Sequence, residues 1–223
     1  MPDNTRFWWE KMSDPKDFLI IPNAEHSEAT GILELLPAIT TFSRGIQVGK
    51  DLDVRPRFNW TISEDGTSIT VRQVSKHTPI AVHMWHAVTC GTKRRDFRVL
   101  SIEGKEECHA CGNLWLKNET EAGVPVCANI KSFWSRKILQ RNPTTGDWVA
   151  EMQPRSDGRW TAFFVHMEYK GLPPNYEYVP PQSPRDWPVS VDGHYQMTTT
   201  VSIIPQTYPF PDCVGNECLG TLI

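Results

Sequence analysis

The chain lacks the features that define several large classes of protein. Its apolar runs, such as residues 18–21, are far shorter than the roughly 20 apolar residues that a membrane-spanning helix needs. Its formal net charge of −3 leaves no basic surface of the kind that nucleic acid or anionic lipid requires. We therefore expect neither a membrane span nor a nucleic-acid partner.

A serine nucleophile is also absent. No serine stands in a Gly-x-Ser-x-Gly motif, the sharp turn that exposes the nucleophile of an α/β-hydrolase. Yet residues 18–21 are typical of a buried parallel strand, and His26 follows shortly after them. Such a hydrolase places its general base in the loop that follows a strand. We expect this chain to be the later part of a larger protein, with any nucleophile before residue 1.

The composition indicates a folded chain in which two patterns meet near residue 50. The 223 residues are 39% apolar and include nine tryptophans, which is enough for a substantial core. Before residue 50, the sequence predicts a short aromatic helix over residues 6–12. A second helix is predicted over about residues 32–43, capped by Ser27 and closed by Gly45. Pro37 predicts that this helix starts or kinks there.

After residue 50 the apolar period changes from helical to two. Three glycine-containing turns separate the predicted strands, and the strand at 160–169 is apolar on both faces, which predicts a central strand. We expect an immunoglobulin-like all-β sandwich at residues 52–209, after the edge of an α/β-hydrolase-like core at 1–46 and before a disulfide-bearing tail at 210–223. The predicted strands span residues 58–62, 68–74, 80–89, 96–102, 148–152, 160–169 and 195–204.

Cysteines and sequons indicate export. The sequons at Asn59 and Asn118 are candidate glycosylation sites, and an even cysteine count is typical of disulfides in extracellular proteins. We predict a secreted protein whose signal peptide lies upstream, because the amino terminus has none. The pairing stays open, since four clustered cysteines allow three connectivities. The disulfide candidates are Cys90, Cys108, Cys111, Cys127, Cys213 and Cys218.

The Cys-x2-Cys pair at Cys108 and Cys111 has two alternatives to disulfide bonding. It could be a zinc half-site or a redox pair, although no βαβ unit surrounds it. The histidines His83, His86 and His166 lie on predicted strands and are expected to pack rather than to bind metal. The leading interpretation therefore includes no metal and no cofactor.

Several separated blocks resemble one protein family. They are Phe-Trp-Trp at 7–9, Pro-Asn-Ala-Glu-His at 22–26, Arg-Asp-Phe-Arg at 95–98, residues 158–164, and Thr-Thr-Thr-Val at 198–201. Together they resemble the carboxyl-terminal portion of the PhoPQ-activated pathogenicity-related protein family, which includes secreted autocrine proliferation repressor proteins.

The resemblance implies a hydrolase core followed by a β-domain, with His26 at the position of the triad histidine. It also implies that the nucleophile and acid lie in a missing amino-terminal core, which would be this chain's partner and without which the chain is inactive. The full protein would then be a serine hydrolase acting on an ester or peptide. The alternatives are a non-catalytic secreted binding or signalling protein with an extracellular protein partner and, more weakly, a zinc-stabilised structural module.

Overall fold

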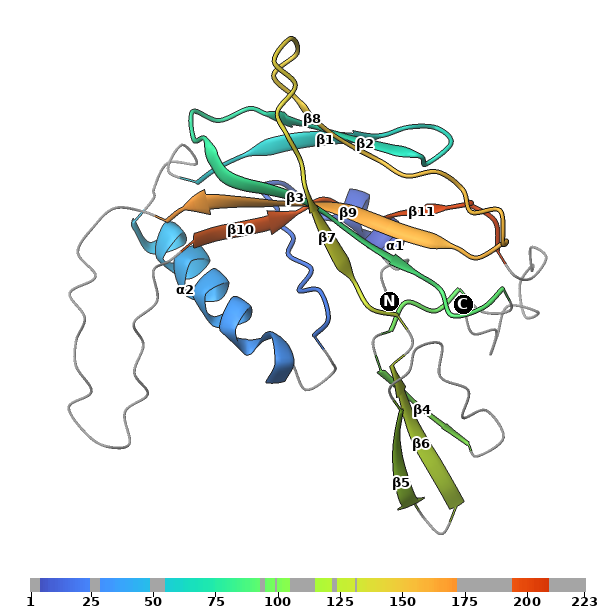
Figure 1. The fold of residues 1–223 in the computed structure, drawn as a ribbon. Coiled ribbons are helices and arrows are strands. Elements are labelled where there is room, and N and C mark those ends of the chain that lie inside the picture. The colour runs from blue at the N-terminus through green and yellow to red at the C-terminus, as the bar shows by residue number, and fades with distance from the viewer. Residues whose placement is uncertain are drawn as a thin grey trace, which may run out of the picture.

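The structure is a computed structural model with helices near the amino terminus and strands over most of the rest (Figure 1). Among the residues described, none of the helices has the length and apolar character that a membrane crossing requires. The helices are α1 (Thr5–Trp8), the 3-10 turns η2 (Trp9–Lys11) and η3 (Ala29–Gly31), and α2 (Ile32–Val48). The described residues are 5–24, 29–48, 55–92, 95–98, 100–104, 115–121, 124–130, 132–171 and 194–208.

The strands form three antiparallel sheets. Sheet A has the order β1-β2-β8, sheet B has the order β10-β9-β3-β7 with β11 also paired to β9, and sheet C has the order β4-β6-β5. Sheet A consists of β1 (Phe58–Ile62), β2 (Ser68–Gln73) and β8 (Trp148–Glu151). Sheet B consists of β3 (Pro79–Val88), β7 (Ser135–Ile138), β9 (Thr161–Lys170), β10 (His194–Thr198) and β11 (Ser202–Ile204). Sheet C consists of β4 (Leu100–Gly104), β5 (Trp115–Glu121) and β6 (Val124–Ile130).

Sheets A and B pack face to face around the main apolar core. Ile69 and Val71 of β2 are fully buried against Val165 and Met167 of β9. This packing follows from the alternation of apolar side chains along each strand, since alternate residues share one face of a sheet. The inner faces of the two sheets are therefore closed by apolar side chains.

The outer face of sheet B carries a second apolar cluster. Phe164 of β9 lies there with Trp134 and Phe97, and the ring centroids of Trp134 and Phe164 are 5.2 Å apart. Ile20 packs against the same cluster. The prediction that the strand near 160–169 is covered on both faces is confirmed.

Residues 18–21 differ from the predicted buried strand. They are half-buried and extended but belong to none of the described sheets. The Thr198 backbone N–H donates to the Phe18 carbonyl oxygen at 2.6 Å, and the Ile20 N–H donates to the Thr198 hydroxyl at 3.1 Å. The apolar run is thus held at the end of β10, where it helps to cover the outer face of sheet B.

Helix α2 forms as predicted but runs past Gly45 to Val48, with Pro37 inside it. Gly45 therefore does not end the helix. A Cβ at this position would overlap the Tyr195 hydroxyl of β10, so glycine allows the helix to approach the sheet closely. The helix packs against β10 through its small residues, among them the buried Ala38.

Most predicted strands and all three predicted turns are present, and the turn glycines Gly66, Gly146 and Gly158 have positive φ. The predicted strand at 195–204 is divided into β10 and β11. At the break, the Val165 N–H donates to the Thr199 hydroxyl at 3.0 Å instead of to a strand carbonyl. The predicted strand at 96–102 begins only at Leu100, and β5, β6 and β7 were not predicted.

The buried inner face of β9 predicts a large effect of cavity formation. Phe163 is 0% exposed, and Phe163→Ala is expected to lower the free energy of unfolding by about 3–5 kcal/mol. Phe133 is 65% exposed, so Phe133→Ala is expected to change the free energy of unfolding by less than about 0.5 kcal/mol. Chemical denaturation of both variants measures the difference, and equal losses would contradict the described core.

Candidate functional sites

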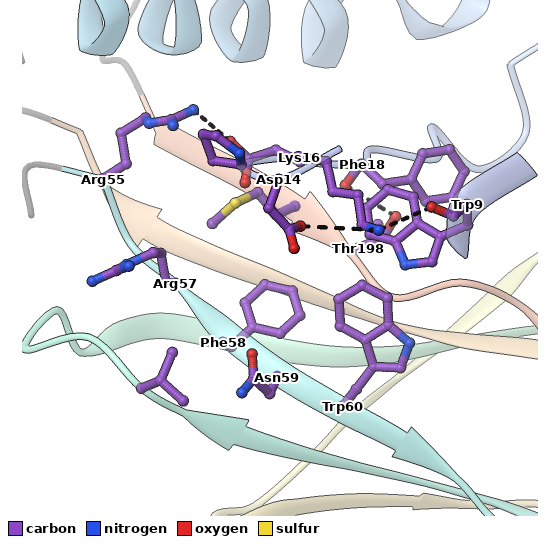
Figure 2. A pocket seen from close by; sticks show the side chains of 14 residues that line it. Trp9, Asp14, Lys16, Phe18, Arg55, Arg57, Phe58, Asn59, Trp60 and Thr198 are labelled. Carbon is purple, nitrogen blue, oxygen red and sulfur yellow. Dashed lines mark hydrogen bonds and ion pairs between the residues drawn. The ribbon is translucent and has the colours of Figure 1, made fainter. Parts of the chain in front are cut away.

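A cleft of about 520 Å³ lies between the segment at residues 14–18 and strand β1. Figure 2 shows aromatic and charged side chains pointing into it from both sides. Trp9 and Phe18 come from the amino-terminal segment, whereas Phe58 and Trp60 come from β1. Segments about 40 residues apart in the sequence therefore form the two walls.

The aromatic rings of the cleft are fixed by contacts with one another. The Trp9 and Trp60 ring centroids are 5.4 Å apart, and those of Phe58 and Trp60 are 5.7 Å apart. The Trp60 indole N–H donates to the Thr200 hydroxyl at 3.1 Å. Because these rings are already held in place, their side chains lose little additional conformational freedom when a ligand binds.

Charged groups lie beside the rings. The Lys16 Nζ donates to the carbonyl oxygens of Trp9 at 2.9 Å and Met12 at 3.1 Å, and it lies 4.9 Å from the Trp9 ring centroid. Arg55 donates to an Asp17 carboxylate oxygen at 2.9 Å, yet burial raises the pKa of Asp17, an effect that Arg55 opposes. The cleft can therefore offer both aromatic faces and polar contacts to one ligand.

Strand β1 is an edge strand within the described part of the chain, where only β2 pairs with it. Its outer edge follows the cleft through Phe58, Asn59 and Trp60. An edge strand presents backbone N–H and C=O groups that can pair with another extended chain. Asn59 is exposed on this strand, so the sequon predicted there is accessible, and its glycosylation stays a prediction.

His26, the predicted general base, lies outside the described residues, as do all of 25–28. The described chain just before it is firmly anchored. Asn23 has a φ of 60°, its side-chain amide donates to the Trp134 carbonyl oxygen at 3.0 Å, and its carbonyl oxygen accepts from the Trp134 N–H at 2.8 Å. The Thr30 hydroxyl also donates to the Asn23 backbone carbonyl at 3.1 Å. These bonds join the turn before His26 to the outer face of sheet B.

The other predicted site residues are only partly described. Cys90 is disulfide-bonded. The side chains of Cys127 on β6 and Asn118 on β5 are not described, and the remaining cysteines lie outside the described residues: Cys108, Cys111, Cys213 and Cys218. The predicted disulfide connectivity and the predicted role of Asn118 therefore stay predictions.

The sequence analysis missed a cluster of ligand-type side chains on the outer face of sheet B. His83 of β3 stands directly opposite His166 of β9, and Glu168 is the next residue along β9 on the same face. The Glu168 Oε1 lies 3.5 Å from the His83 Nδ1 and 3.9 Å from the His166 Nδ1. Spacing within the chain gives no signal for this cluster, because it depends on the register between two distant strands.

Two comparisons relate the chain to known proteins. Residues 1–98 match the family described as PhoPQ-activated pathogenicity-related protein. Over 229 aligned residues the chain is 28% identical to autocrine proliferation repressor protein A of Dictyostelium discoideum. The match covers 99% of this chain but 38% of that protein. No solved structure matches the chain significantly.

These matches agree with the resemblance predicted from the sequence blocks: residues 1–98 are similar to the PhoPQ-activated pathogenicity-related protein family, and the chain as a whole is similar to the Dictyostelium protein. The family match includes the turn at Asn23 and the position of His26. It also includes β1 and therefore both walls of the cleft.

The anchoring of Asn23 leads to a local prediction. Asn23→Gly keeps the positive φ but removes both side-chain bonds to Trp134, which are together worth about 1–3 kcal/mol. We expect amide hydrogen exchange at the Trp134 N–H to become about tenfold faster or more. Asn142→Gly removes two comparable turn bonds, to the N–H groups of Thr144 and Thr145, and is the matched control. Unchanged exchange at Trp134 in Asn23→Gly would contradict the anchoring.

Proposed function

We propose that this chain is part of a secreted protein of serine-hydrolase type, in which α2 packs against the rest of a hydrolase core. The observation that carries this proposal is the outward face of α2. Leu33 is 86% exposed, Ile39 is 51% exposed and Ile46 is 58% exposed. Ile32, Leu36 and Phe42 are also exposed along the same helix.

This exposure is unusual because the opposite side of α2 is already covered. Ala38 and Thr41 are buried toward β10, and Gly45 meets Tyr195 there. A helix that is apolar on both sides is typical of one with protein on both sides, and a contiguous exposed apolar patch marks an interaction surface. The chain aligns with 38% of the Dictyostelium protein. This supports further polypeptide of the same protein as the segment that covers the exposed face of α2.

His26 precedes α2 in the sequence, and it follows Asn23, which is fixed by its bonds to Trp134. In this proposal the imidazole takes the proton of a serine in the hydrolase core and returns it to the leaving group, while a carboxylate of that core orients the ring. The family relationship supports this role for His26. The substrate class is an ester or a peptide.

Kinetics on the longer protein test this role. Its hydrolysis of p-nitrophenyl butyrate and its labelling by a fluorophosphonate are expected, and His26→Gln is expected to lower kcat by about 10³-fold or more. His77→Gln is the control, because His77 is a half-buried histidine whose ring contacts Ser75. A longer protein that neither hydrolyses the ester nor accepts the label would contradict the proposal.

The cleft supports a second candidate function, that of a secreted binding or signalling protein. The rings of Trp9 and Trp60 beside the edge of β1 would suit an extended segment of a protein partner, which would add to the edge through backbone bonds and place side chains on the rings. The name of the Dictyostelium relative, autocrine proliferation repressor protein A, agrees with this class of function.

Cell growth tests the second candidate. Purified chain added to cultures of the organism that makes it is expected to lengthen the doubling time, and Trp60→Ala is expected to abolish most of this effect by removing one wall of the cleft. Phe133→Ala, which removes an exposed aromatic ring elsewhere, is expected to retain it. A growth effect that Trp60→Ala leaves intact would exclude the cleft as the binding site.

A further inference from the structure

The outer face of sheet B brings together three side chains that commonly bind divalent metal ions. His83 and His166 are cross-strand neighbours, and Glu168 follows on the same face of β9. The ligand atoms of these three residues all lie within 4.8 Å of one another. The proposed hydrolase chemistry does not use them.

Each imidazole has a buried nitrogen without a hydrogen-bond partner in the described part of the chain. These atoms are the His83 Nδ1 and the His166 Nε2, in residues that are 8% and 4% exposed. A buried polar atom without a partner destabilises the folded chain, so such atoms need an explanation. For the His83 Nδ1, which lies 3.5 Å from the Glu168 Oε1, a metal ion bound between these two atoms would provide one.

Both rings are buried, and burial lowers the pKa of each imidazole. The geometry that carries the site is the cross-strand pairing of the two histidines and the distance of at most 4.8 Å between the three ligand atoms.

The charges around the cluster favour a cation. Glu34, at the start of α2, lies near enough to Glu168 for the two carboxylates to repel each other. Arg136 of β7 is a nearby positive group that partly offsets them. A divalent ion would relieve the repulsion between Glu34 and Glu168.

We propose that His83, His166 and Glu168 form a binding site for a divalent ion of the zinc type on the outer face of sheet B. Tetrahedral zinc with bonds of about 2.0–2.1 Å places its ligands roughly 3.3 Å apart. The 3.5 Å between the His83 Nδ1 and the Glu168 Oε1 needs an adjustment of only a few tenths of an ångström. Two imidazoles and one carboxylate leave a fourth position for water. The site is separate from the zinc half-site considered for Cys108 and Cys111.

The test uses the complete 223-residue chain, freed of metal with a chelator and then titrated with Zn²⁺ by calorimetry. We expect one zinc ion per chain. Glu168→Gln and His83→Gln are each expected to weaken binding by about tenfold or more. The matched control is His86→Gln, since His86 lies on β3 with its side chain on the opposite face from His83. This control is expected to bind within about twofold of the original chain.

Titration with Co²⁺ separates this site from the cysteines. Coordination by nitrogen and oxygen gives visible d–d bands without the strong near-ultraviolet charge-transfer band of a thiolate ligand. Circular dichroism confirms that each variant is folded, and Glu168→Gln is decisive because its side chain is 22% exposed and the change preserves its shape. The proposal is overturned if the folded chain binds no zinc, if folded Glu168→Gln binds as tightly as the original, or if the cobalt spectrum is that of thiolate ligation.

Discussion

Both faces of strand β9 are buried, and the elements that cover them lie on either side of sheet B. On the inner face, Val165 and Met167 meet sheet A. On the outer face, Phe164 meets Trp134, whose backbone is bonded to Asn23. A strand buried on both faces requires a layer on each side, and here sheet A and the amino-terminal segments supply those two layers. The amino-terminal segments are therefore part of the same folded unit as the strands.

This arrangement also determines which faces and edges of the sheets carry polar side chains that could bind a ligand or react. The inner face of β9 is filled by apolar side chains, so polar functional groups lie on the outer face or beyond the edges of the sheets. The outer face changes character along β9, from the apolar environment of Phe164 to the polar cluster of His166 and Glu168. The cleft lies elsewhere, at the edge of β1 that no described strand pairs with, and uses aromatic rings from Trp9 and Trp60. The two candidate sites thus involve different parts of the molecule.

The sequence predicted the elements that have a strong local signal. Strand β1 was predicted to the residue, because alternating side chains end at a turn in which Gly66 has a positive φ. Strand β7 was missed because its four side chains are all exposed and Ile138 is the one apolar residue among them, so the sequence shows no alternation there. The half-burial of residues 18–21 was missed because an apolar run predicts burial but not which surface it covers.

The candidate sites were predicted less well for a related reason. The position of His26 carries a local sequence signal, and the family match includes it. The pairing of His83 with His166 depends on a register between strands about 80 residues apart, and the cleft depends on the packing of Trp9 against Trp60. The spacing of residues along the chain predicts neither the pairing of the histidines nor the packing of the tryptophans, since both arise only when the layers are assembled.

The apolar outer face of α2 is the feature on which the proposed packing against further polypeptide rests. Leu33 and Ile39 are exposed on this face, and Asn23, which precedes the helix, is bonded to Trp134. Amide hydrogen exchange of α2, compared between the 223-residue chain and the longer protein that contains it, tests this account most directly. The account predicts that α2 exchanges much more slowly in the longer protein while β9 is unchanged. Equal exchange of α2 in both proteins would contradict it.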